Sequence, residues 1–127
     1  MRILLDTHIF LWVTMDAPQL TPSARALIQE AHEVYVSAAS IWEIAIKSAI
    51  GKIEADAEEM AEAIELSGFI ELPITSRHTA KVAKLPFLNR HKDPFDRLLV
   101  AQSMVEPLVL VTVDPKIVAY GGLTQKI

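Results

Sequence analysis

Short apolar runs alternate with helix-like segments along the chain, and this alternation limits the possible folds most. The runs at Met1–Leu5, Val34–Ser37, Phe69–Ile74 and Pro107–Val113 have the length of buried strands, and the last is also rich in β-branched residues. Because these runs are apolar at nearly every position rather than at every second one, helices must cover both faces of the sheet. The sequence therefore predicts an α/β fold, a three-layer sandwich whose mainly parallel sheet is flanked by helices.

Helix-start and helix-stop residues lie between these runs. Thr21 followed by Pro22 predicts a helix start, and Gly51 predicts the end of a helix that begins at Ala38. That helix is apolar around nearly its whole circumference, so we expect the core or a second chain to bury it on more than one side. The expected helices cover residues 22–31, 38–50, 56–67, 76–85 and 94–105.

Length and composition narrow the class of protein. With 127 residues the chain can form one domain with its own core, so we expect a single domain over residues 1–127. The chain has no cysteine, so any metal must be bound by oxygen or imidazole ligands. Asp6 follows the first apolar run too early for a signal peptide, and no run approaches the ~18 apolar residues of a membrane span. We therefore expect a cytoplasmic protein with no membrane partner.

The charges are unevenly distributed along the chain. The net charge of −4 argues at first against a nucleic-acid partner. However, residues 54–71 carry seven acids and no base, whereas residues 77–97 carry six Lys or Arg side chains. We interpret the acidic segment as a solvated helix face. The basic segment is either another solvated face or a surface that contacts phosphates.

Four acids have positions that suit helix capping. Asp6 and Asp114 each follow an apolar run and precede a helix-like segment or a proline. Glu43 has capping-box spacing from Ser40, and Asp96 lies in the first turn of its helix, where an acid favours the helix dipole. Taken one at a time, each of these acids has a purely structural explanation.

Taken together, the same acids predict a metal site. Asp6 and Asp114 both follow strands, so both lie at the carboxyl edge of the sheet, where ligands bind in such folds. The helix that carries Asp96 runs antiparallel to the strand after it, so its start rises to the same edge, and Glu43 joins them if its helix has a similar orientation. Carboxylates gathered there repel each other by several kcal/mol unless a cation such as Mg²⁺ lies among them. Two such ions about 4 Å apart can promote phosphodiester hydrolysis.

Four segments carry a family resemblance: "LLDTHIFLW", "SAASIWEIAIKSAIGKI", "HKDPFDRLLVAQS" and "LVTVDPKIVAYG". In this order and spacing, over essentially the whole chain, they resemble PIN-domain ribonucleases, and specifically the VapC-type toxins of toxin–antitoxin pairs. The resemblance implies an endoribonuclease that hydrolyses RNA phosphodiester bonds, forms a homodimer and is blocked by a cognate antitoxin. It also implies one or two Mg²⁺ or Mn²⁺ ions, held by an acidic quartet: Asp6, Glu43, Asp96 and Asp114.

Other residues are expected to support the quartet or to bind substrate. The resemblance implies that the Thr112 hydroxyl supports the site. Thr7 is likewise expected to support the site or to bind substrate. Asp93 is predicted to be the N-cap of the helix opened by Pro94, with an outer role at the metal left open. Arg97 could contact a substrate phosphate or form a salt bridge. His8 and His91 flank the site, but lone histidines rarely ligate Mg²⁺, and Lys47 has the spacing to pair with Glu43.

Two functions from other classes compete with a nuclease. A phospho-receiver signalling domain also places acids at strand ends, but it needs a phosphate-accepting Asp after its third strand, and "FIELPITS" ends without one. A non-catalytic module could instead use the metal only structurally and use the apolar helix to dock a partner.

Overall fold

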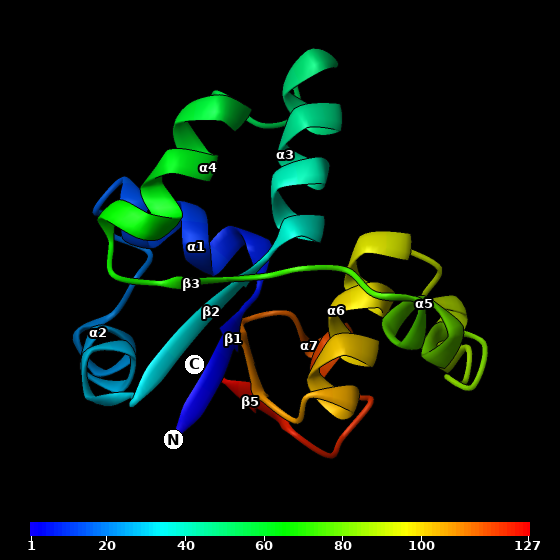
Figure 1. Ribbon diagram of the computed structural model, residues 1–127. Helices are drawn as coiled ribbons and strands as arrows, with labels where there is room; N and C mark the ends of the chain where they lie inside the picture. The colour runs from blue at the N-terminus through cyan, green and yellow to red at the C-terminus, as the bar shows by residue number, and fades with distance from the viewer.

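Five strands form one sheet in which all neighbours are parallel (Figure 1). The computed structural model describes residues 1–127 except for the side chain of Asn89. The strand order is β3-β2-β1-β4-β5. The strands are β1 (Arg2–Leu5), β2 (Glu33–Ser37), β3 (Ile70–Leu72), β4 (Val109–Thr112) and β5 (Thr124–Lys126). The predicted strands are confirmed with small changes at their ends, and only the short polar β5 was not expected.

Helices connect and cover the strands. They are α1 (Thr7–Thr14), α2 (Pro22–Glu30), α3 (Ala38–Ala49), α4 (Ala57–Leu66), α5 (Ser76–Val82), the 3₁₀ turn η1 (Leu88–Arg90), α6 (Pro94–Val105) and α7 (Pro115–Val118). Thr21 caps α2 and Asp93 caps α6, each with a proline at the helix start, as predicted. Among the described residues, none of these helices has the length and apolar character that a membrane crossing requires.

The two faces of the sheet have separate cores. Ile3 and Leu5 of β1 lie in a core with α1, α2 and α4, whereas Leu4 lies in the other with α6 and α7. Figure 1 shows α1, α2 and α4 on one side of the strands and α5, α6 and α7 on the other. This alternation along a strand buries both faces, so the predicted three-layer sandwich is confirmed.

The register of the sheet brings chain segments distant in sequence to one edge. Leu5 pairs with Val111, and the Asp6 amide donates a 3.0 Å hydrogen bond to the Val111 carbonyl. Because β1, β2 and β4 are parallel, α1, α3 and α7, which follow them directly, all begin at the same carboxyl edge. The side chains at these three helix starts therefore lie close together.

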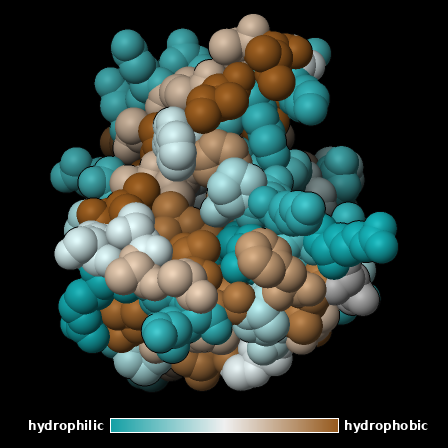
Figure 2. All heavy atoms as spheres, turned by 90° about the vertical axis from the view of Figure 1, so that its right-hand side faces the viewer, coloured by the Kyte–Doolittle hydropathy of each residue, from teal (hydrophilic) through white to brown (hydrophobic). Residues whose placement is uncertain are grey.

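Helix α3 is only half buried by the core. Its inner residues Ala39 and Ile44 are fully buried, but Trp42, Ile46 and Ile50 are 52%, 41% and 61% exposed. Figure 2 shows apolar side chains gathered at the top of the molecule, where α3 ends. This chain's own core therefore covers α3 where α1, α4 and α6 contact it and leaves the outer side of the helix uncovered among the described residues. Burial of that outer side by a second chain stays a prediction.

Candidate active site

A cavity of about 570 Å³ opens at the carboxyl edge of the sheet, and acids dominate its lining. Asp6, Glu43, Asp96 and Asp114 all line it, so the structure brings the four predicted acids together. Asp93 is a fifth acid in the lining, and the cationic groups beside them include Lys47 and Lys116. Their roles as metal ligands and catalytic groups stay predictions.

Asp6 is held rigidly between two strands and a helix. It is 4% exposed; its Oδ1 accepts a 2.7 Å hydrogen bond from the Thr7 amide, and its Oδ2 accepts one of 2.7 Å from the Thr112 hydroxyl. The Thr112 Oγ1 in turn accepts a 3.0 Å hydrogen bond from the Asp114 amide. One hydroxyl therefore fixes the ends of β1 and β4 to each other, in agreement with the supporting role expected for Thr112.

Thr7 acts behind the cavity rather than in it. Its side chain is 1% exposed, and its hydroxyl donates a 2.8 Å hydrogen bond to the Ser40 hydroxyl, which joins the start of α1 to the start of α3. The cavity lining does not include Thr7. A substrate contact by this side chain is therefore not seen, whereas a supporting role agrees with its position.

Glu43 does not belong to a capping box. The N-cap of α3 is Ser37, whose hydroxyl accepts from the Ala39 amide at 3.0 Å, so Glu43 lies well inside the helix. The capping interpretation is wrong because α3 starts at Ala38, directly after β2 and two residues before Ser40. Glu43 instead projects into the cavity with 2% exposure.

The two carboxylate oxygens of Glu43 differ in their partners. Oε2 lies 2.5 Å from the Lys47 ammonium, which is the helical ion pair that their spacing predicts. Oε1 is buried and has no hydrogen-bond partner among the described residues. A buried oxygen without a donor is costly, so this atom is suited to a cation.

Asp93 and Asp96 have different positions at the start of α6: Asp93 caps the helix, and Asp96 lies in its first turn. Asp93 Oδ1 accepts from the amides of Phe95 and Asp96, at 2.9 and 3.0 Å, so its predicted N-cap role is confirmed. Its Oδ2 lies 3.9 Å from the Lys47 ammonium at the cavity wall. Asp96 lies three residues further on, and its Oδ2 is 3.0 Å from Nε2 of the buried His91.

Asp114 closes the cavity from β4. Its Oδ1 accepts a 2.9 Å hydrogen bond from the Lys116 amide and caps α7, so the cap expected before Pro115 is present. Asp114 is only partly buried, unlike Asp6 and Glu43. Capping occupies Oδ1, and Oδ2 has no hydrogen bond among the described residues.

Arg97 takes neither of its two expected roles. Its side chain is 4% exposed, is absent from the cavity lining, and forms no salt bridge among the described residues. Its guanidinium donates to backbone carbonyls, among them Pro86 at 2.8 Å, and to the Tyr120 hydroxyl at 3.0 Å. The expectation was wrong because Arg97, one residue after Asp96, lies on a different side of α6. Its side chain points toward α5 and the backbone that follows it instead of into the cavity.

Burial and mutual repulsion alter the charges in the cavity. Burial raises the pKa of Asp96 to about 7, with a further contribution from the negative charge of Asp93. Burial likewise raises the pKa of Asp6, although the Thr112 hydroxyl opposes this. Burial alone would lower the pKa of Lys47. The hydrogen bond to Glu43 and the nearby negative charges together outweigh burial, so the pKa of Lys47 is raised. Without a cation, ionising all the acids of the cavity is unfavourable.

These residues fit a hard cation that keeps part of its water. Within the described part of the chain, no three acidic or histidine side chains are arranged as a finished metal cage. Mg²⁺ does not require one, because it usually binds one or two carboxylates directly and fills its remaining positions with water and substrate oxygens. The unpartnered Oε1 of Glu43 and the acids around it supply such oxygen ligands.

The raised pKa of Asp96 predicts how the stability of the metal-free protein depends on pH. An acid whose pKa is higher in the folded than in the unfolded state destabilises the fold once both states can ionise. The penalty is absent below the ordinary value of 3.8, grows as the pH rises, and is complete above about 7. With 1.36 kcal/mol for each pKa unit, its upper bound is about 4 kcal/mol.

Urea unfolding in EDTA at pH 5 and pH 8 measures this effect. Because other groups also titrate, the comparison is between the wild-type protein and Asp96→Asn. We expect the free energy of unfolding to fall more between these pH values in the wild type than in the variant. An equal fall in both proteins would contradict a penalty at Asp96.

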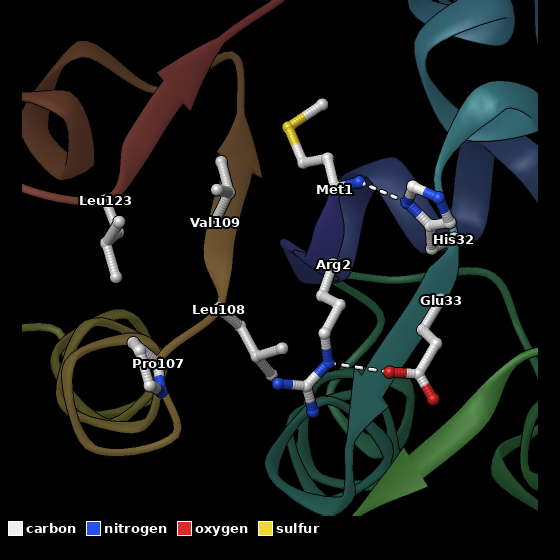
Figure 3. A pocket seen from close by; sticks show the side chains of 8 residues that line it. All are labelled: Met1, Arg2, His32, Glu33, Pro107, Leu108, Val109 and Leu123. Atoms are coloured by element: carbon white, nitrogen blue, oxygen red, sulfur yellow. Dashed lines mark hydrogen bonds and ion pairs between the residues drawn. The ribbon is translucent and has the colours of Figure 1, made fainter.

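A second cavity lies at the opposite edge of the sheet and differs in character. It has a volume of about 560 Å³ and lies at the amino ends of β1, β2 and β4 (Figure 3). Its charged groups are already paired: Arg2 lies 2.6 Å from Glu33, and the Met1 amino group lies 2.6 Å from His32 Nδ1. The remaining lining is mostly apolar, so of these two cavities only the one at the carboxyl edge gathers an excess of acids.

The order of the strands excludes the receiver-domain alternative. Flavodoxin-like receivers have the order 2-1-3-4-5, whereas this sheet has the order 3-2-1-4-5. In addition, β3 is followed by Pro73 rather than by an acid.

Comparisons with solved structures agree on the fold. The crystal structure of VapBC2 from Rickettsia felis bound to a DNA fragment from their promoter matches with a TM-score of 0.72 and 16% identity, covering 99% of this chain and 98% of that one. A toxin–antitoxin complex from Klebsiella pneumoniae matches with a TM-score of 0.68 and 18% identity, over 97% and 95% of the two chains. FitAcB from Neisseria gonorrhoeae matches with a TM-score of 0.64 and 21% identity, over 96% and 95%.

Comparisons of sequence identify the family. No curated protein matches the chain. The model of the PIN domain family, in contrast, matches residues 3–123, which is nearly the whole length and includes all four predicted acids of the cavity, Asp6, Glu43, Asp96 and Asp114. The chain therefore belongs to the PIN domain family.

Proposed function

We propose that this protein is a Mg²⁺- or Mn²⁺-dependent endoribonuclease, the toxin of a toxin–antitoxin pair that acts in the cytoplasm. One observation carries the proposal: four acids from four separate elements share one cavity, and a buried oxygen of Glu43 has no protein donor among the described residues. Membership of the PIN domain family and the likeness in fold to solved toxin–antitoxin complexes support it.

The chain's own residues would bind and orient one or two divalent ions. Such an ion supplies positive charge to the reacting phosphate and favours ionisation of a water. Asp6 and Glu43, the most buried acids, would be the fixed ligands, because Thr112 and Lys47 already hold one oxygen of each. Asp96 and Asp114 would complete the ligand set from the other side of the cavity.

The apolar face of α3 supports the proposed protein partners. Trp42, Ile46 and Ile50 follow each other at four-residue spacing and are all exposed. The Trp42 ring packs at 4.9 Å against the ring of Phe95, the residue next to Asp96, so this face adjoins the cavity. A cognate antitoxin helix docked here would also obstruct the site, and part of the same face could join two copies in the proposed homodimer.

A basic surface on α5 is the proposed contact for the RNA backbone. Arg77, Lys81 and Lys84 line one shallow hollow there, and none of them is in an ion pair among the described residues. Figure 1 places α5 on the far side of the molecule from the acidic helix α4. The negative net charge of the chain is therefore compatible with an RNA-binding side.

Removing two of these charges should weaken RNA binding. We expect Lys81→Gln with Lys84→Gln to reduce RNA affinity about tenfold at low salt and to lower the slope of log affinity against log salt by ~0.7 for each phosphate that is no longer neutralised. Filter binding in Ca²⁺ with catalytically impaired protein measures both quantities. Lys52→Gln, a surface change outside this hollow, is the control, and equal effects of the two changes would contradict the proposed surface.

Cleavage by the purified protein tests the proposed function. We expect RNA to be cut at internal positions in Mg²⁺ or Mn²⁺ and to stay intact in EDTA, with restoration when the metal is added back. Tight Mg²⁺ binding without cleavage of any RNA from a total cellular preparation would favour the non-catalytic module instead. Expression in a bacterial host should arrest growth, and a cognate antitoxin should relieve that arrest.

A further inference from the structure

His91 is a buried side chain that touches one of the proposed ligands. It is 6% exposed; its Nε2 lies 3.0 Å from Asp96 Oδ2, and its Nδ1 lies 3.2 Å from the Tyr120 hydroxyl. Among the described residues, no other side chain forms a hydrogen bond with the Asp96 carboxylate. The sequence places His91 beside the predicted site without assigning it a role, and nothing in the sequence indicates Tyr120.

The hydrogen bonds around Tyr120 favour one direction for the contact between its hydroxyl and His91. An arginine guanidinium can only donate, so the Tyr120 hydroxyl oxygen must accept the 3.0 Å bond from Arg97 Nη1. The Tyr120 hydroxyl proton can then be donated to His91 Nδ1. With Nδ1 as the acceptor, the neutral imidazole carries its proton on Nε2 and donates it to Asp96.

Arg97 anchors the start of this chain of hydrogen bonds. Its Nη1 also donates to the Pro86 carbonyl at 2.8 Å, and its Nη2 donates to the carbonyls of Val82 and Leu85, both at 3.3 Å. The Phe87 ring covers the guanidinium at 4.2 Å. The guanidinium is thus fixed by the backbone that follows α5 and cannot turn toward the cavity.

We propose that His91 is a positioning residue: it holds the Asp96 carboxylate in its ligand orientation, in the tautomer set by Tyr120 and Arg97. The proposal rests on the proposed metal-dependent function. The bond from His91 fixes Oδ2 and leaves Oδ1 without a hydrogen bond among the described residues, available to a cation. Changes to partners that orient a metal ligand in this way typically reduce metal affinity 10–100-fold.

Binding of Mn²⁺ in the absence of RNA tests the proposal without using activity. We expect His91→Ala to raise the Mn²⁺ dissociation constant roughly 10–100-fold by calorimetry. His91→Gln should recover most of the loss, because its side-chain amide keeps an N–H donor with similar reach. If His91→Ala folds and binds Mn²⁺ as the wild type does, the proposal is overturned.

The tautomer provides a second test that needs neither metal nor activity. In metal-free wild-type protein at pH 8, the ¹⁵N chemical shifts should show His91 protonated at Nε2 and not at Nδ1. Tyr120→Phe removes the proton donated to Nδ1, so this preference should weaken and the Mn²⁺ dissociation constant should rise several-fold. Protonation of His91 at Nδ1 in the wild type would overturn the proposal.

The two failures can be told apart. If the wild type neither binds Mn²⁺ nor cleaves RNA, the proposed function fails, while the tautomer experiment still decides the arrangement around His91. If the wild type does both and neither His91→Ala nor Tyr120→Phe changes Mn²⁺ affinity, only the positioning role fails.

Discussion

Asp96→Asn should reduce metal-dependent RNA cleavage roughly a thousandfold, which corresponds to about 4 kcal/mol of lost transition-state stabilisation. The substitution keeps the shape of the side chain, and the amide oxygen can still accept from His91, but the negative charge that attracts the cation is lost. The backbone amide of residue 96 still donates to Asp93, so the start of α6 is unchanged. Single-turnover cleavage of a labelled RNA in Mg²⁺ measures the loss, and Asp6→Asn should behave in the same way.

Asp93→Asn is the matched control for this prediction. Asp93 lines the same cavity only three residues earlier, and asparagine is an equally good N-cap, so cleavage should stay within about tenfold of the wild type. Mg²⁺ should raise the melting temperature of the wild type and of Asp93→Asn, but not of Asp96→Asn. Undiminished cleavage by purified Asp96→Asn would remove the basis of the proposed mechanism.

Lys47→Met should destabilise the metal-free protein by about 3 kcal/mol, the typical cost of breaking one side of a buried pair. The Glu43 carboxylate is 2% exposed and its neighbours in the cavity are acids, so removing the ammonium that lies 2.5 Å away leaves a buried charge uncompensated. Urea unfolding in EDTA at pH 8 measures the change. Saturating Mg²⁺ should restore part of the lost stability by taking over the role of the ammonium.

Two further variants separate charge from packing in this prediction. Lys116→Met removes the same charge from the exposed rim of the cavity and should change stability by less than about 0.5 kcal/mol. Glu43→Gln combined with Lys47→Met should recover most of the stability, because neither partner is then charged. A Lys47→Met protein that is as stable as the wild type in EDTA would show that Glu43 is neutral in the metal-free fold.

The sequence predicts the sheet well because its strands are buried on both faces. A continuous apolar run of the length of β4 predicts a buried strand. The helix starts at Thr21 and Asp93 can be predicted because their capping signals depend only on neighbouring residues. The short strand β5 could not be predicted in this way, because it lacks such an apolar run. β5 is three polar residues at the edge of the sheet, and it forms because the register of β4 positions it rather than because of its own propensity.

The acids of the cavity could be predicted, but the directions of their neighbours could not. Parallel strands and antiparallel helices are enough to bring Asp6, Asp96 and Asp114 to one edge of a sheet. The direction of Arg97 depends on which face of α6 packs against α5, and the role of Tyr120 depends on a bond across the fold. Such contacts arise from tertiary packing, for which the sequence has no periodic signal.

The hydrogen bond between Thr112 and Asp6 joins residues 106 positions apart in the chain. A nascent chain that ends before Val109 lacks β4 and Asp114, so it has neither the Thr112 hydroxyl that holds Asp6 nor the fourth predicted acid. The cavity can therefore assemble only after β1 and β4 have paired. If the chain is the ribonuclease proposed above, its activity must follow this long-range pairing rather than precede it.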